Sequence, residues 1–218
     1  MFNRLKNISA NYIMMAAVLL CAMLVLISGL NMTASSKASA EQSKAKPMRI
    51  VSMSVSADEM LLALVGDKRL IAVSPWSDVP SVSCISNEVK NIPFRAQGSN
   101  AEAMLAMRGD LIVVPDYSRA EAVSTLRESG ANVFVCPTPH SIDEVKQTLR
   151  QLGKLVGEED KAEKIIVEME QKLQRISKQI ANIPQEKRVK VLRMQEKGSY
   201  YAPKTSFMEV CRLAGMQD

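Results

Sequence analysis

The pattern of hydrophobic positions in the first 160 residues alternates between short apolar runs and longer amphipathic segments. Four apolar runs predict buried strands, at residues 49–53, 69–74, 110–114 and 132–136. Four amphipathic segments predict helices, at residues 56–65, 101–107, 119–128 and 141–156. Short strands alternating with helices favour an α/β fold, in which helices cover both faces of a parallel sheet.

Helix starts and stops support this division. Ser56–Glu59 and Ser141–Glu144 each have the S-x-x-E spacing of a capping box, and Asn100 precedes a third helix as a candidate N-cap. Glycines mark the expected helix ends, at Gly66, Gly109 and Gly130. The segment from 75 to 93 is rich in proline and serine and is long for a compact α/β domain, which makes it a candidate binding loop.

The segment from 160 to 180 interrupts the alternation. Its apolar residues recur at steps of three and four, which predicts one apolar stripe along roughly 30 Å of helix. The stripe consists of Ala162, Ile165, Ile166, Met169, Leu173, Ile176 and Ile180. The stripe alone is compatible both with a strut between two lobes and with an ordinary amphipathic helix.

Two further elements follow the long helix. Residues 188–194 alternate like a strand, and residues 206–215 predict a capped helix that ends at Gly215. One strand and one helix cannot bury their own apolar faces. We therefore expect them to be the start of a second lobe that is cut short at the end of this sequence.

The first 40 residues have the pattern of an export signal. Arg4 and Lys6 precede an apolar run at 13–30, and small residues end at Ala40, so we expect cleavage before Glu41. The run just reaches membrane-spanning length, which leaves an uncleaved anchor as the alternative. Either way, the positive residues before the apolar run predict that the body of the chain lies outside the cytoplasm.

Charge and composition exclude several functions. The formal charge of the whole chain is +5, but beyond residue 40 only 25 basic residues face 23 acidic ones, and no long basic run occurs, so we expect no nucleic-acid partner. We found no G-x-G-x-x-G after the first strand, no phosphate loop and no G-x-S-x-G motif. His140 is the only histidine. We expect neither an enzyme nor a cofactor nor a metal site.

Three segments together resemble the periplasmic binding proteins of cobalamin and iron-siderophore ABC importers. They are RIVSMSVSADEMLLALVG from Arg49, QGSNAEAMLAMRGDLIVV from Gln97, and LRESGANVFVCPTPHSIDEVKQTLRQLGKLVG from Leu126. The resemblance covers about residues 49–180 and, more weakly, 188–215. It implies an N-terminal Rossmann-like lobe (48–157), a rigid connecting helix (158–182) and an incomplete second α/β lobe (188–218), with ligand held between the lobes.

Candidate ligand contacts follow from strand ends, because small molecules bind at the carboxyl ends of such sheets. Ser54, Ser56, Trp76 and Tyr117 follow the first three strands. Trp76, the only tryptophan, lies where the family's cobalamin binders place an aromatic residue and can stack on a flat ligand; the alternative is a tryptophan packed under the long loop. Tyr200 and Tyr201 are candidates from the second lobe.

One departure from the family weakens a cobalamin assignment. Ala96 occupies the position where the resemblance implies a second tryptophan in cobalamin binders. The ligand therefore remains open between a cobalamin-like corrinoid and a ferric siderophore, with haem as a further alternative. A chain with half a cleft could also be a non-binding remnant at the membrane.

The short helix at 101–107 carries a carboxylate, Glu102, in its first turn. In the family, a carboxylate at this position on the outer surface of the first lobe forms a salt bridge with arginines of the permease. The resemblance thus implies a docking role for Glu102 with an ABC transporter permease. The alternative is that Glu102 only complements the helix dipole. We expect a monomeric, exported solute-binding protein.

Overall fold

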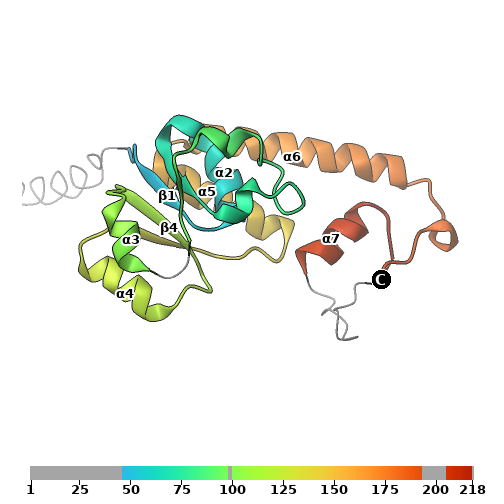
Figure 1. The fold of residues 1–218 in the computed structure, drawn as a ribbon. Helices are drawn as coiled ribbons and strands as arrows, with labels where there is room; N and C mark the ends of the chain where they lie inside the picture. Colours follow the sequence, from blue (N-terminus) through green and yellow to red (C-terminus); the bar gives the residue numbers. More distant parts are fainter. Residues whose placement is uncertain (1–45, 98–99, 193–204, 218) are drawn as a thin grey trace, which may run out of the picture. The chain divides into compact units, whose positions relative to one another are not determined.

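A five-stranded parallel sheet organises the protein, as the computed structural model in Figure 1 shows for residues 46–97, 100–192 and 205–217. Its strands are β1 (Ile50–Ser52), β2 (Leu70–Val73), β3 (Phe94–Arg95), β4 (Leu111–Pro115) and β5 (Val133–Cys136). Their spatial order is β3-β2-β1-β4-β5, and every pair is parallel. This order is that of a Rossmann-like sheet, so the predicted α/β fold with a parallel sheet is confirmed.

Helices cover both faces of the sheet (Figure 1). The helices are α2 (Val55–Val65), α3 (Ala101–Ala106), α4 (Ala120–Glu128), α5 (Ile142–Val156), α6 (Glu159–Ile180) and α7 (Ser206–Leu213). Successive strand residues point to opposite faces: Ile50 packs in a core with α2, α5 and α6, whereas Val51 packs in a second core with α3 and α4. Burial on both faces explains why the strands are continuous apolar runs.

The sequence analysis missed one strand. β3 has only two residues, pairs with β2 at the edge of the sheet and is partly exposed, so it produces no apolar run. The loop that precedes β3 is also more ordered than expected. It contains two 3₁₀ turns, Pro75–Asp78 and Glu88–Asn91, and it buries Val89 in the first core.

Two of the predicted helix boundaries are wrong in detail. The first capping box does not form, because α2 starts at Val55 and its N-cap is Ser54, whose Oγ accepts a hydrogen bond from the Ala57 amide. The end of α3 depends on Arg108, which adopts the left-handed conformation (φ 52°), rather than on Gly109. Gly109 is needed for packing instead, since a Cβ atom there would lie 2.9 Å from the Val51 side chain.

The predicted capping box at the start of α5 forms in part: Ser141 is the N-cap, but the Glu144 carboxylate accepts its hydrogen bond from the His140 amide instead of the Ser141 amide. Ser141 Oγ accepts a hydrogen bond from the Glu144 amide at 3.1 Å. Gly157 ends the helix in the left-handed conformation (φ 70°), which favours glycine.

The long helix α6 has 22 residues, and its first half packs closely on α5. Ala162 and Ile166 are buried there, while the apolar residues of the second half are only partly buried. Ion pairs between Arg150 and Glu163 and between Lys146 and Glu170 border the contact. The role of α6 as a strut between two lobes stays a prediction.

The C-terminal elements differ from the expected strand and helix in one respect. Within the described part of 188–194, pairing is limited to an isolated parallel bridge between Lys190 and Gln217. The helix is confirmed as α7, with Thr205 as its N-cap. A carboxylate oxygen of Glu209 on α7 accepts a hydrogen bond from the Ile142 amide at 2.7 Å.

The predicted leader lies outside the described residues. Among the helices that the structure describes, none combines the length and apolar character needed to cross a membrane.

The α5–α6 contact gives a first testable prediction. A Cβ atom on Gly153 would lie 2.7 Å from the Cβ of Ala162, so the two helices approach closely only because residue 153 is glycine. We expect Gly153→Val to lower the free energy of unfolding by about 1–3 kcal/mol through overpacking, measured by urea denaturation. Lys154→Val, one residue away and exposed, is the control, with an expected change within about 0.5 kcal/mol. An equal loss in both variants would contradict this packing account.

Candidate functional site

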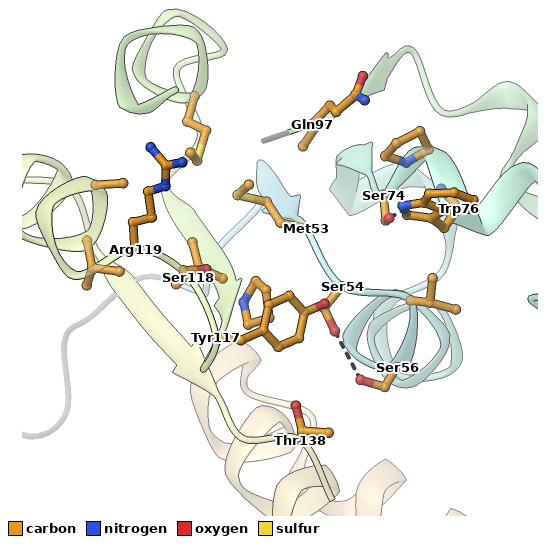
Figure 2. Close-up of a pocket in the computed structure, with 18 of the residues that line it drawn as sticks. Met53, Ser54, Ser56, Ser74, Trp76, Gln97, Tyr117, Ser118, Arg119 and Thr138 are labelled. Carbon is orange, nitrogen blue, oxygen red and sulfur yellow. Dashed lines mark hydrogen bonds between the residues drawn. The ribbon is translucent and has the colours of Figure 1, made fainter. Parts of the chain in front are cut away.

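A cavity of about 500 Å³ lies at the carboxyl ends of the strands (Figure 2). Its walls come from the segments that follow β1, β2, β3, β4 and β5. Most of its lining residues belong to the ends of β1 and β4 and the segments that follow them, the two strands at which the strand order reverses direction. Ligands of open α/β sheets bind at this switch point because the neighbouring loops diverge there.

The structure brings four predicted site residues to the same cavity. Ser54 and Ser56 line it from the start of α2, Trp76 from the turn after β2, and Tyr117 from the loop after β4. Figure 2 shows all four around one opening. Their role in ligand binding stays a prediction, and Tyr200 and Tyr201 lie outside the described residues.

Both aromatic side chains are largely open to solvent. Trp76 is 62% exposed and Tyr117 is 75% exposed. A tryptophan packed under the long loop would be buried, so that alternative is wrong. Exposed rings at the mouth of an apolar cavity offer flat faces to a ligand.

Hydroxyl groups form the floor between the aromatic residues. Ser54 Oγ and Ser56 Oγ are 3.0 Å apart and share a hydrogen bond (Figure 2). Ser74 Oγ accepts a hydrogen bond from the Trp76 amide and so fixes the start of the turn that carries the indole. The cavity therefore combines apolar walls with a few oriented polar groups, as small-molecule sites usually do.

Several lining residues were missed by the sequence analysis. Gln97 follows the unpredicted strand β3, and Thr138 follows β5. Arg119 lines the cavity as the N-cap residue of α4, and it is the only charged residue among the described lining residues. Arg119 was not predicted as a site residue because it lies at the expected start of a helix, although it is only four residues beyond the end of β4. Ala96, the departure from cobalamin binders, also lines the cavity.

The turn that carries Trp76 is held by a buried carboxylate, Asp58 of α2. Asp58 Oδ2 accepts hydrogen bonds from the Ser74 amide at 2.7 Å and from Ser77 Oγ at 2.6 Å. Burial raises the pKa of Asp58 to about 6, and the hydroxyls of Ser52 and Ser77 and the amide of Ser74 only partly offset this rise. Among the described residues, neither Ser52 Oγ nor Asp58 Oδ1 has a well-aligned hydrogen-bond partner.

Two further carboxylates fix the rest of the long loop. Asp78 pairs with Arg95 in two parallel contacts of 2.6 and 2.7 Å, and the hydrogen bonds from Arg95 lower the pKa of Asp78. Glu59 accepts hydrogen bonds from Ser83 Oγ and from the Cys84 amide. The wall that carries Trp76 is therefore attached to the core at three points.

A fourth carboxylate holds the loop that carries Tyr117. Asp116 accepts hydrogen bonds from the Thr138 amide and from Thr138 Oγ1, each at 2.8 Å. The hydrogen bond from the backbone amide is the main cause of a lowered pKa at Asp116. This contact ties the ends of β4 and β5 together beside the cavity.

Glu102 lies away from the cavity. Its side chain is exposed in the first turn of α3, and Asn100 caps that helix by accepting a hydrogen bond from the Ala103 amide. The expected surface position is confirmed, while docking with a permease stays a prediction.

A family model described as "periplasmic binding protein" matches residues 50–218. The chain belongs to this family. Periplasmic binding proteins bind solutes and are not enzymes, so the expectation of a non-enzymatic protein is confirmed. The family also places the protein outside the cytoplasm.

Named relatives of this periplasmic binding protein differ in their ligands. It is 29% identical over 134 residues to a vitamin B12-binding protein of Pectobacterium carotovorum, covering 61% of this chain and 46% of the relative. It is 24% identical over 143 residues to the iron-uptake system-binding protein of Bacillus subtilis, covering 63% and 44%. The chain thus spans about half the length of these curated relatives.

A solved structure adds a third ligand class. The periplasmic haem-binding protein HutB of Vibrio cholerae superposes with a TM-score of 0.64 at 25% identity, covering 78% of this chain and 65% of that chain.

The buried Asp58 of this periplasmic binding protein predicts a specific pH dependence of stability. Because its pKa is about 6 in the folded chain and about 4 in an unfolded one, its folded state binds a proton more tightly. Wild-type stability due to Asp58 is therefore greatest below about pH 4 and is lost as the pH rises through about 6. The variant Asp58→Asn has no group at this position that binds or releases a proton in this pH range. We expect its free energy of unfolding, relative to wild type, to rise by up to about 3 kcal/mol across this window.

The measurement is urea unfolding of both proteins at several pH values. A constant difference between them at every pH would contradict the raised pKa of Asp58.

Proposed function

We propose that the protein is the extracytoplasmic solute-binding component of an ABC importer and captures a metal-chelate nutrient. The observation that carries this proposal is the convergence of Trp76, Tyr117 and the serine hydroxyls on one cavity at the switch point of the sheet. The family match supports the same conclusion. The mechanism is reversible binding, with the rings stacking on a flat face of the ligand and the hydroxyls orienting it.

The ligand we propose is a cobalamin-like corrinoid or a ferric siderophore, with haem as an alternative of the same family. All three ligand types present a flat or rounded face with polar groups at the edge. Arg119 favours a ligand that carries a negative group, such as a carboxylate, because a guanidinium binds carboxylates with two parallel hydrogen bonds. Ala96 leaves the cavity wall small where a second tryptophan is expected for cobalamin.

A second lobe completes the cleft in this proposal. The segment from 188 onward is its start, Tyr200 and Tyr201 contact the ligand from that side, and α6 connects the two lobes. An N-terminal export signal or anchor at residues 1–40 takes the protein across the membrane. A chain that binds no chelate at all would favour the alternative of a membrane-attached remnant.

A titration panel tests this proposal. We would add cyanocobalamin, a ferric hydroxamate chelate and haemin separately to the purified protein and follow tryptophan emission, which reports on Trp76 alone because the chain has one tryptophan. One ligand class should quench the emission with saturation. Trp76→Ala should weaken its binding about fivefold, measured by calorimetry, since a lost stacking contact amounts to about 1 kcal/mol.

The variant Arg119→Gln tests whether the ligand that binds carries a carboxylate. If the bound ligand carries a carboxylate, the variant should weaken it by about tenfold or more, while Arg119→Lys keeps part of the affinity. Saturable binding with no change in Trp76 emission would remove Trp76 from the site. Absence of binding across the panel would contradict the proposed function.

Transport tests the docking role of Glu102. An exposed carboxylate guides association with a positively charged partner more than it adds affinity. We therefore expect Glu102→Ala to lower ligand uptake by cells several-fold while leaving ligand affinity unchanged. Glu121→Ala, in the first turn of the neighbouring helix α4 and also exposed, is the matched control and should transport normally. A large loss of affinity in Glu102→Ala would show that Glu102 belongs to the pocket.

A further inference from the structure

Asp58 is fully buried beneath the cavity and does not line it. Its carboxylate nevertheless reaches the segment that carries Trp76. One oxygen, Oδ2, accepts hydrogen bonds from Ser74 and from Ser77, the residues that lie on either side of Pro75 and Trp76. This one carboxylate oxygen of Asp58 therefore binds both ends of the turn, and Trp76 lies between these two ends and lines the cavity.

The turn has few other attachments near Trp76. The Ser77 amide donates to the Ser74 carbonyl at 3.0 Å, and the Val79 amide donates to the Trp76 carbonyl at 3.2 Å. Both bonds lie within the turn and do not connect it to the sheet or to α2. The indole itself is mostly exposed, so its own packing does not fix its direction. The Asp78–Arg95 ion pair holds the last residue of the turn to β3. The two bonds to Asp58 attach the turn to α2 and hold the residues on both sides of Pro75 and Trp76.

We propose that Asp58 is a positioning residue for Trp76. Asp58 holds the indole in its binding orientation from below the cavity. Ligand affinity then depends on the charge of Asp58, although this side chain does not touch the ligand. This inference rests on the proposed function for its ligand-binding part. The conformational part stands on the geometry of Asp58, Ser74 and Ser77 alone.

The hydrogen bonds to Asp58 are strongest when the carboxylate is ionised, because bonds to a charged acceptor are about twice as strong as neutral ones. Burial places the pKa of Asp58 at about 6. At neutral pH the ionised group holds the turn firmly, and below about pH 6 the neutral acid accepts the same donors more weakly. Ligand affinity is therefore expected to fall as the surroundings become acidic.

Three other groups act electrostatically on Asp58. Glu59, next to it on α2, opposes its ionisation. Arg95 from β3 favours its ionisation and is itself paired with Asp78. Cys136 at the end of β5 has a pKa raised to about 11, chiefly by burial, so this thiol stays neutral throughout the relevant range.

The test uses the whole chain, with the emission anisotropy of Trp76 as a local measure of mobility. Without ligand, the wild-type anisotropy should fall as the pH is lowered from about 7.5 to about 5, with a midpoint near 6. Asp58→Asn should give the low value at every pH. The affinity for whichever panel ligand binds should fall about tenfold over the same range in wild type and stay flat and low in Asp58→Asn.

Two control variants separate the effect of Asp58 from effects of other titratable side chains. Asp67→Asn removes an exposed carboxylate just beyond the end of α2 and should behave like wild type. His140→Gln removes the only histidine of the chain and should keep the wild-type profile. If Asp58→Asn does not fold, Ser77→Ala, which removes one of the two donors, should show a reduced anisotropy at neutral pH.

The outcomes for the two proposals are distinct. A wild-type anisotropy that is independent of pH, or a profile that persists in Asp58→Asn, would overturn the role of Asp58 even if a chelate binds. If no chelate binds, the proposed function fails, while a pH-dependent anisotropy abolished by Asp58→Asn still supports the positioning role.

Discussion

The parallel pairing of β1 with β2 on one side and β4 on the other is the constraint on which the rest of the structure depends. Parallel strands require a crossover connection after each strand, which here is an α-helix in every case except the long loop between β2 and β3, so every strand ends at the same edge of the sheet. That edge is where the serines after β1, the tryptophan turn after β2 and the tyrosine loop after β4 meet. The cavity is therefore a direct consequence of strand order rather than of any single loop.

Carboxylates attach the cavity walls to this scaffold, and they do so in two different ways. Asp116 and Asp78 are exposed acids whose partners lower their pKa values, so these contacts strengthen as the groups ionise. Asp58 is buried, and its ionised form destabilises the fold at neutral pH. Retaining a group that lowers stability is typical of functional positions, because a neutral residue of similar shape is generally better tolerated there. The two hydrogen bonds to the tryptophan turn give a reason for its presence.

The same arrangement makes the cavity suited to capture rather than to chemistry. Its walls present exposed aromatic faces, hydroxyl groups and one guanidinium, Arg119, and these groups suit the flat chelates with polar edges that we propose as ligands. Two of the similar proteins are a vitamin B12-binding protein and a haem-binding protein by name, a third is the binding protein of an iron-uptake system, and both vitamin B12 and haem have such a face. A preset tryptophan reduces the entropy lost on binding, which is how a partly exposed site gains affinity.

The sequence by itself determined the parallel sheet, the helix positions and four residues of the cavity. Buried parallel strands must be continuous apolar runs, and residues that follow such runs must lie at the ligand edge. Only the tertiary structure revealed the short edge strand β3 and the lining role of Arg119, because neither produces a local pattern. It also showed that Asp58 holds the turn around Trp76, a contact that no local pattern indicates. Asp58 and Ser74 are 16 residues apart along the chain, and their hydrogen bond exists only because α2 and the end of β2 pack together.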